Sequence, residues 1–382
     1  MEATTKRTAA AFAALDALYW AGNASGMGFL TAYFLKCGLG SGILSLVIAI
    51  FQALSLAGGV FWGNLCDRRG TNQRIFLPVF PACQGILLLI YYLASRNMTL
   101  ACLLYFAAGF LISSMGTNLD VWILRSVRYD PASFGVIRGI GSIGYAVSML
   151  ATGFLVEAFG YSVIVTASYL FAIPTMVLAV LLKEPVFLRN NTRKASASAL
   201  LGNRPYIYLV IVILLSGMAV NPVSSLQPVL LDSVGGSVSV LGIDMFAAVM
   251  FQGLFIMLSG KFARFSPHMR MVLMTLALLA ELICTGLART PMLIILGMIF
   301  SNVSYGIMMP TMRELVTKYV PEDLRNTAHS LTDMIFGSLS GILSLSCSSL
   351  LIHRFGIRSI VVAGLALLVA PLVMSIRRNS FR

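Results

Sequence analysis

A carboxylate and a guanidinium lie inside two long apolar runs, at equal distances from the polar turn that joins the runs. Asp120 precedes Tyr129 by nine residues, and Arg138 follows Tyr129 by nine. If the runs form an antiparallel helical hairpin, both charges lie at one depth, about 10 Å or more beyond the turn at roughly 1.5 Å per residue. Charges inside a membrane usually pair or line a wet cavity, since a lone one costs about 2.5 kcal/mol or more. Tyr145 lies two helical turns after Arg138, on the same face. These side chains predict one wall of a binding site for a polar solute.

The chemistry of the three groups suits a hydroxylated solute. A carboxylate accepts hydrogen bonds from hydroxyls, a guanidinium donates a planar fork, and an aromatic ring covers an apolar face. The alternative is an ion pair that only joins two helices. Other polar side chains in the apolar runs are candidates to line the same cavity, although each also fits an interhelical hydrogen bond. They are Asn23, Gln252, Asn302 and Tyr305.

Two further acids within apolar runs are candidates to carry a proton. Glu281 lies between Ala280 and Leu282, and Asp16 lies in the first run. A buried carboxylate suits a proton carrier because burial favours its uncharged form. The alternatives are a protonated, silent glutamate near lipid and a helix-end role for Asp16.

Composition predicts an all-α membrane protein. Of 382 residues, 58% are hydrophobic and only 11% are charged. Apolar runs of about 20 residues follow one another along the chain, which is the signature of membrane-spanning helices. The twelve predicted spans cover residues 11–35, 42–65, 75–95, 99–124, 133–158, 162–183, 206–231, 240–262, 270–289, 292–318, 326–351 and 357–376.

The same residues argue against other classes of protein. The net charge of +13 comes from bases in short loops rather than from one basic surface, which disfavours nucleic-acid binding. The six cysteines have no metal-ligand spacing. Neither a Ser/His/Asp set nor a nucleotide-binding loop is found, so we expect no enzyme, no cofactor and no metal site.

Basic residues predict the orientation of the spans. With both termini in the cytoplasm, and Arg138 counted with its adjoining loop, all but five of the 27 Lys and Arg residues fall on the cytoplasmic side. The five exceptions are Lys36, Arg96, Arg289, Arg354 and Arg358. Short loops and the absence of a large soluble domain favour a bacterial inner membrane, and we expect a monomer.

The chain divides into two six-helix halves. Residues 1–183 and 205–382 are the predicted bundles, and the polar stretch 184–204 is a predicted cytoplasmic linker. Short motifs recur at matching places in the two halves, such as Phe159-Gly160 and Phe355-Gly356. Repeats of this kind allow alternating access to a midplane site.

The loop Gly63-Asn64-Leu65-Cys66-Asp67-Arg68-Arg69-Gly70 resembles the signature between spans 2 and 3 of the major facilitator superfamily. The resemblance covers essentially the whole chain and implies the twelve-helix transporter fold. It also implies a conformational latch formed by Gly63, Asp67, Arg68 and Gly70. In the second half, Arg264 stands where Asp67 stands in the first, so the latch there is degenerate.

Phe134-Gly135-Val136-Ile137-Arg138, with Gly141, Gly144 and Tyr145, is similar to the helix-5 motif of lactose permease and its oligosaccharide, nucleoside and phenylpropionate relatives. In lactose permease, a helix-4 carboxylate and a helix-5 arginine bind the sugar, and an aromatic ring stacks on it. The resemblance implies these roles for Asp120, Arg138 and Tyr145, although the sugar permease has tryptophan at the third position. The glycines are interpreted as packing residues.

The second half departs from lactose permease. Val249, Glu281, Ser301 and Ser304 align with its helix-8 carboxylate, helix-9 arginine, and helix-10 histidine and glutamate. We therefore expect a secondary active transporter of a small polar solute, with sugar or glycoside favoured and proton coupling by Glu281 or Asp16. The alternatives are a proton-driven exporter of amphipathic compounds, an uncoupled facilitator, and a membrane receptor or scaffold on a transporter fold.

Overall fold

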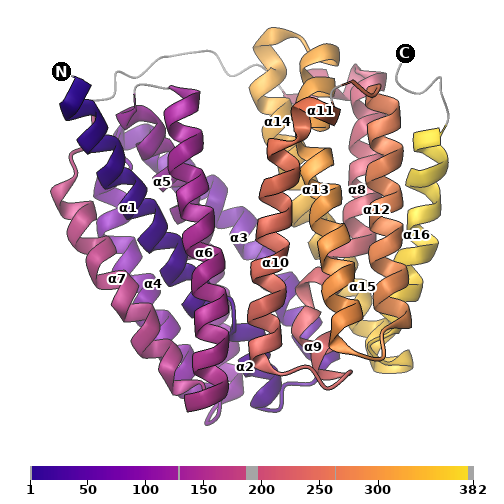
Figure 1. Ribbon diagram of the computed structural model, residues 1–382, viewed down its shortest axis with the longest axis horizontal. Coiled ribbons are helices and arrows are strands. Elements are labelled where there is room, and N and C mark those ends of the chain that lie inside the picture. The colour runs from indigo at the N-terminus through magenta and orange to yellow at the C-terminus, as the bar shows by residue number, and fades with distance from the viewer. Residues whose placement is uncertain (1, 128–129, 186–196, 263, 377–382) are drawn as a thin grey trace. The chain divides into compact units, whose positions relative to one another are not determined.

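The computed structural model describes residues 2–127, 130–185, 197–262 and 264–376, which form helices joined by short connections (Figure 1). Tyr129, the midpoint of the predicted hairpin, and linker residues 186–196 lie outside these ranges. The side chain of Asp67 also lies outside the described part of the structure.

Within each half of the described chain, few residues separate one helix from the next. Those of the first half are α1 (Glu2–Met27), α2 (Leu30–Lys36), α3 (Ser41–Arg69), α4 (Gln73–Leu93), α5 (Met98–Ser126), α6 (Pro131–Phe159) and α7 (Ser162–Leu181). Those that follow are η1 (Ala197–Gly202), α8 (Arg204–Ser225), α9 (Gln227–Asp232), α10 (Val238–Met257), α11 (Ser259–Phe262), α12 (Pro267–Leu287), α13 (Pro291–Tyr319), η2 (Glu322–Leu324), α14 (Arg325–Met334), η3 (Ile335–Leu339), α15 (Ser340–Phe355) and α16 (Ser359–Ile376).

Among the described residues, eleven helical stretches are long and apolar enough to cross a membrane. They match the predicted spans from the second to the last. The first predicted span corresponds to α1, whose 26 residues extend about 39 Å at 1.5 Å per residue. The structure therefore confirms an all-helical membrane fold.

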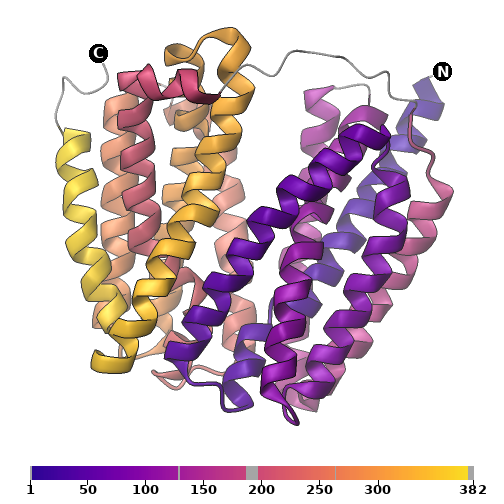
Figure 2. The same cartoon turned by 180° about the vertical axis from the view of Figure 1, so that it is seen from behind.

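The described residues divide into two compact units. The first comprises Met1–Leu39, Ile50–Asn191 and Ser237–Phe246, and the second comprises Gly40–Ala49, Thr192–Gly236 and Ala247–Arg382. In the first unit, α1 packs on α6 and α7, while α4 packs on α5 and α7 (Figure 1). In the second, α12 packs on α13 and α16, while α8 packs on α15 and α16 (Figure 2).

Two predicted spans are each divided into two helices. The span 11–35 breaks between α1 and α2 at Gly28, where a Cβ atom would overlap Met149 Sδ of α6. The span 206–231 breaks between α8 and α9 just before Pro228, which has no backbone N–H to continue a helix.

The span 326–351 contains a π-helical turn, η3, between α14 and α15. Asn221 of α8 donates from Nδ2 to Phe336 O at 2.9 Å and to Ser340 Oγ at 2.6 Å. A side chain that bonds a backbone carbonyl in this way competes with the α-helical hydrogen-bond ladder, and π turns occur at such insertions.

The connection between α5 and α6 is short and well capped. Asp130 Oδ2 accepts from Ser133 N at 3.0 Å and from Ser133 Oγ at 2.5 Å, and Pro131 is the first residue of α6. An N-cap acid followed by proline is a strong helix-start signal. It fixes where α6 begins, and therefore where Arg138 lies along it.

The predicted latch loop ends in a turn that requires glycine. Gly70 has φ +65°, a left-handed conformation that glycine adopts without strain. A Cβ atom at Gly63 would meet open space, so close packing does not explain that glycine. Arg68 is exposed.

Glu184, just after α7, holds the start of α4. Its carboxylate accepts from Thr71 Oγ1 at 2.6 Å, from Asn72 N at 2.8 Å and from Gln73 N at 3.0 Å. It also lies 3.5 Å from Arg125 Nη1 at the end of α5, and its side chain is 7% exposed. A carboxylate at a helix N-terminus satisfies free backbone N–H groups and complements the helix dipole. Glu184 therefore ties together α4, α5 and the end of α7.

Glu184→Gln is expected to lower the free energy of unfolding by about 2–4 kcal/mol, because the amide loses the ion pair and leaves buried donors poorly satisfied. Denaturant unfolding in detergent micelles, followed by circular dichroism, measures the change. Glu322→Gln is the matched control, since Glu322 is exposed, and it should change stability little. Equal stability of the two variants would contradict this role for Glu184.

Candidate functional site

Asp120 and Arg138 lie next to each other, as the hairpin geometry predicted. Arg138 Nε of α6 is 3.5 Å from Asp120 Oδ1 of α5. The side chain of Asp120 is 30% exposed and that of Arg138 is 32% exposed, so neither partner is fully buried. At 3.5 Å the two atoms are farther apart than in a normal charge-assisted hydrogen bond, so each partner can also bond to another group.

Asp16 joins the same site from α1. Its Oδ2 lies 3.8 Å from Arg138 Nη1, and its side chain is fully buried. The guanidinium therefore lies between two acids, one partly exposed and one enclosed. The sequence marked Asp16 as a proton-carrying candidate but contained no signal that it meets Arg138.

The glycines of α6 differ in what they contact. A Cβ atom at Gly141 would overlap Asp16 Oδ2 and lie 2.8 Å from Asp16 Cγ. At Gly144 it would lie 2.8 Å from Ala17 O, whereas at Gly139 it would meet open space. Two of the three glycines thus allow α1 to approach α6, and Gly141 makes room for the Asp16 carboxylate itself.

Trp20 lies at the same site, although it was not among the residues predicted from the sequence. The Arg138 guanidinium carbon lies 4.3 Å from the centre of the Trp20 ring, within cation–π range. The Tyr145 ring meets the Trp20 ring edge-to-face at 6.4 Å. Gly116 of α5 permits this arrangement, because a Cβ atom there would lie 3.1 Å from Trp20. The available signal was the spacing of Trp20 from Asp16, which is one helical turn.

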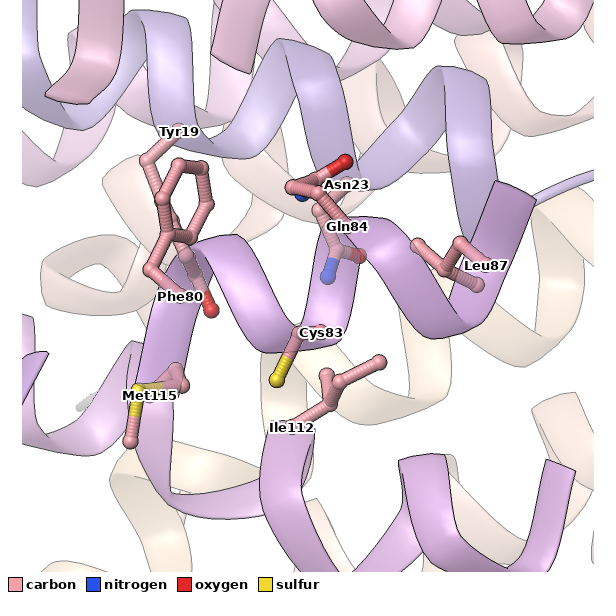
Figure 3. A pocket seen from close by; sticks show the side chains of 8 residues that line it. All are labelled: Tyr19, Asn23, Phe80, Cys83, Gln84, Leu87, Ile112 and Met115. Atoms are coloured by element: carbon pink, nitrogen blue, oxygen red, sulfur yellow. The ribbon is translucent and has the colours of Figure 1, made fainter. Parts of the chain in front are cut away.

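A pocket lies next to this site, farther along α1 (Figure 3). It is a small cavity of about 10 Å³ between α1, α4 and α5. The amides of Asn23 and Gln84 are its polar lining, and Asn23 was a predicted cavity residue. Tyr19 connects the two places, since it lines the pocket and precedes Trp20. The lining residues are Tyr19, Asn23, Phe80, Cys83, Gln84, Leu87, Ile112 and Met115.

The candidates of the second half occupy α10 and α13. Asn302 donates from Nδ2 to Met298 O of its own helix at 2.9 Å. The Tyr305 ring packs against Phe336 with centroids 6.0 Å apart. Gln252 lies where α10 approaches α13, because a Cβ atom at Gly306 would be 3.4 Å from Gln252 O.

Two more acids are buried in the described structure. Glu281 of α12 is fully buried on the helix face that meets α13, where a Cβ atom at Gly297 would lie 3.1 Å from Glu281 O. Asp244 of α10 is also fully buried, and the sequence analysis passed over it. No group of three or more His, Cys, Asp or Glu among the described residues is placed to hold a metal ion.

Comparison with known proteins identifies the family. Residues 14–358 match the MFS_1 like family. The chain is 22% identical to the maltose permease of Geobacillus stearothermophilus over 323 residues, which cover 82% of this chain and 80% of that protein.

Solved transporter structures share the fold. A mutant of the nucleoside transporter NupG superposes with a TM-score of 0.79 at 16% identity, covering 96% of this chain and 98% of that one. A bacterial homologue of the human lysosomal transporter Spinster superposes with a TM-score of 0.64 at 15% identity, covering 99% and 96%. This chain is therefore a multi-pass membrane transporter rather than an enzyme, and it belongs to the MFS_1-like family of the major facilitator superfamily.

Proposed function

We propose that this transporter moves a small polar organic solute, with a sugar or glycoside favoured, together with a proton by alternating access. The observation that carries the proposal is the position of Arg138 between Asp120 and Asp16. Asp120 and Arg138 hold the solute, and the rings of Tyr145 and Trp20 cover its apolar face.

A hydroxyl group fits the partly open pair because it can donate and accept at once. It donates to the carboxylate of Asp120 and accepts from the guanidinium of Arg138, whose closest atoms are 3.5 Å apart. Trp20 already holds one face of the guanidinium, so Arg138 is oriented before the solute arrives.

Arg138 also links the solute to the proton. A solute that takes up hydrogen bonds from Arg138 weakens its attraction for Asp16. An ionised carboxylate without a close cation is costly in an enclosed, apolar place, so Asp16 then binds a proton. By thermodynamic linkage, protonation of Asp16 then strengthens solute binding by the same factor by which the solute strengthens proton binding.

Other parts of the proposal rest on the sequence. Glu281 is the second candidate for proton carrier, and Gln252, Asn302 and Tyr305 are further candidates to contact the solute. Gly63, Asp67, Arg68 and Gly70 form the proposed conformational latch. Both termini are placed in the cytoplasm, with the protein as a monomer in a bacterial inner membrane.

Proteoliposomes that contain a pH-sensitive dye test the coupling. Maltose and uridine are the first probes, because relatives include a maltose permease and a nucleoside transporter. An inward solute gradient should acidify the lumen in the wild type. Asp16→Asn should abolish the acidification but keep solute exchange, whereas Glu281→Gln should keep both.

Each other outcome selects an alternative. Loss of acidification in Glu281→Gln alone would make Glu281 the carrier. Solute flux without proton movement in the wild type would indicate a facilitator, and proton movement opposite to the solute would indicate an exporter. No flux of any solute from a panel of sugars, nucleosides and amphipathic compounds would indicate a receptor or scaffold.

A further inference from the structure

We infer that this site discriminates by charge: it binds uncharged polyols and rejects their acidic counterparts. The inference rests on the proposed function and narrows its substrate class. It follows from how the guanidinium of Arg138 is shared between Asp120 and Asp16.

The two acids divide the donors of Arg138. Nε faces Asp120 Oδ1 at 3.5 Å, and Nη1 faces Asp16 Oδ2 at 3.8 Å. A carboxylate is bound strongly by arginine when two neighbouring N–H groups point at it in parallel. Arginine offers two such pairs of donors, a side pair that includes Nε and an end pair that includes Nη1. Nε already faces Asp120, and Nη1 already faces Asp16. A solute carboxylate therefore finds no free fork.

Asp120 adds a second requirement. Its Oδ1 is buried and accepts no hydrogen bond among the described residues. The exposed part of the carboxylate can accept from a solute hydroxyl, whereas a solute carboxylate can only accept. An acid bound here would give Asp120 no hydrogen bond and would place two anions in contact.

The local charge gives the same selectivity. One guanidinium stands against two carboxylates, so the cluster carries no surplus of positive charge in any protonation state of Asp16. Trp20 covers a face of the guanidinium, which removes a second direction of approach for an anion. In this low-dielectric setting, repulsion between like charges is much stronger than in water.

Matched pairs of solutes test the inference: glucose and glucuronate, galactose and galacturonate, and uridine and uridine 5′-carboxylate. Thermal-shift titration of the purified wild-type protein gives the apparent affinity of each member, since a ligand of the folded state raises its stability. We expect at least one neutral member to bind, and its acid to bind at least about tenfold more weakly, a difference of about 1.4 kcal/mol. In Asp120→Asn, which removes one anion, the acid should gain relative to the neutral member.

Two outcomes overturn the inference. An acid that binds the wild type within about tenfold of its neutral partner refutes charge discrimination and leaves the transport proposal standing. Absence of binding by all six compounds refutes the proposed polyol site, and the inference with it. The wild-type comparison decides by itself, so a failure of Asp120→Asn to fold does not remove the test.

Discussion

Arg138→Ala protein is expected to take up solute at least about 100-fold more slowly than the wild type. Leaving a buried charge without its partner costs roughly 2–5 kcal/mol, and Arg138 is the partner of the fully buried Asp16 as well as of the partly exposed Asp120. Among the described residues, Arg138 supplies the one cationic nitrogen within 4.0 Å of the enclosed Asp16 carboxylate. On the proposed function, the substitution removes both the main hydrogen-bond donor to the solute and the cation that links the solute to protonation of Asp16.

Radiolabelled uptake in proteoliposomes measures the effect, with thermal unfolding to show that the variant folds. Arg74→Ala is the control, since Arg74 is exposed at the start of α4, and it should transport normally. Arg138→Lys should recover only part of the rate, because lysine keeps the charge but not the planar fork. Unchanged uptake in Arg138→Ala would remove the site assignment.

Gly141→Ala is expected to disable the site, whereas Gly139→Ala is not. The new methyl group at position 141 overlaps Asp16 Oδ2 and lies 3.2 Å from Trp20 Cδ1, so either α1 or the carboxylate must move. Overpacking of this kind costs about 1–3 kcal/mol, which corresponds to a loss of roughly fivefold to 150-fold in the population of the intact site. Position 139 has open space for a methyl group.

The pair is a close comparison because both variants make the same chemical change on the same helix, two residues apart. Uptake and proton movement should both fall in Gly141→Ala and stay near wild type in Gly139→Ala. Adding Asp16→Ala to Gly141→Ala should restore thermal stability, since the overlap is gone, but not proton movement. Similar behaviour of the two single variants would show that contact with Asp16 is unimportant.

Local sequence patterns were sufficient to predict the spans and the Asp120–Arg138 pair. The pair is predictable because the two helices are neighbours in sequence and the charges are equidistant from the turn. Asp130 and Pro131 then define the start of α6. The breaks at Gly28 and before Pro228 were less visible, because the runs stay apolar across them.

The remaining parts of the site depend on tertiary packing. Asp16 reaches Arg138 because small residues let α1 lie close against α6, and no pattern within one helix encodes that register. Gly139 and Gly141 look alike in sequence, yet only the second faces a carboxylate. Trp20 was missed for the same reason, since its partners Arg138 and Tyr145 lie on another helix.

The different exposure of the two acids has a consequence for how ions cross. Asp16 is sealed from solvent, while Asp120 and Arg138 beside it are about one-third open. On the proposed function, we therefore expect a proton that reaches Asp16 to enter past Asp120 and Arg138, by the same opening as the solute. An analogue that binds at this opening without being transported would therefore block proton leak as well as solute transport. Movement of one without the other would require the opening to be unoccupied.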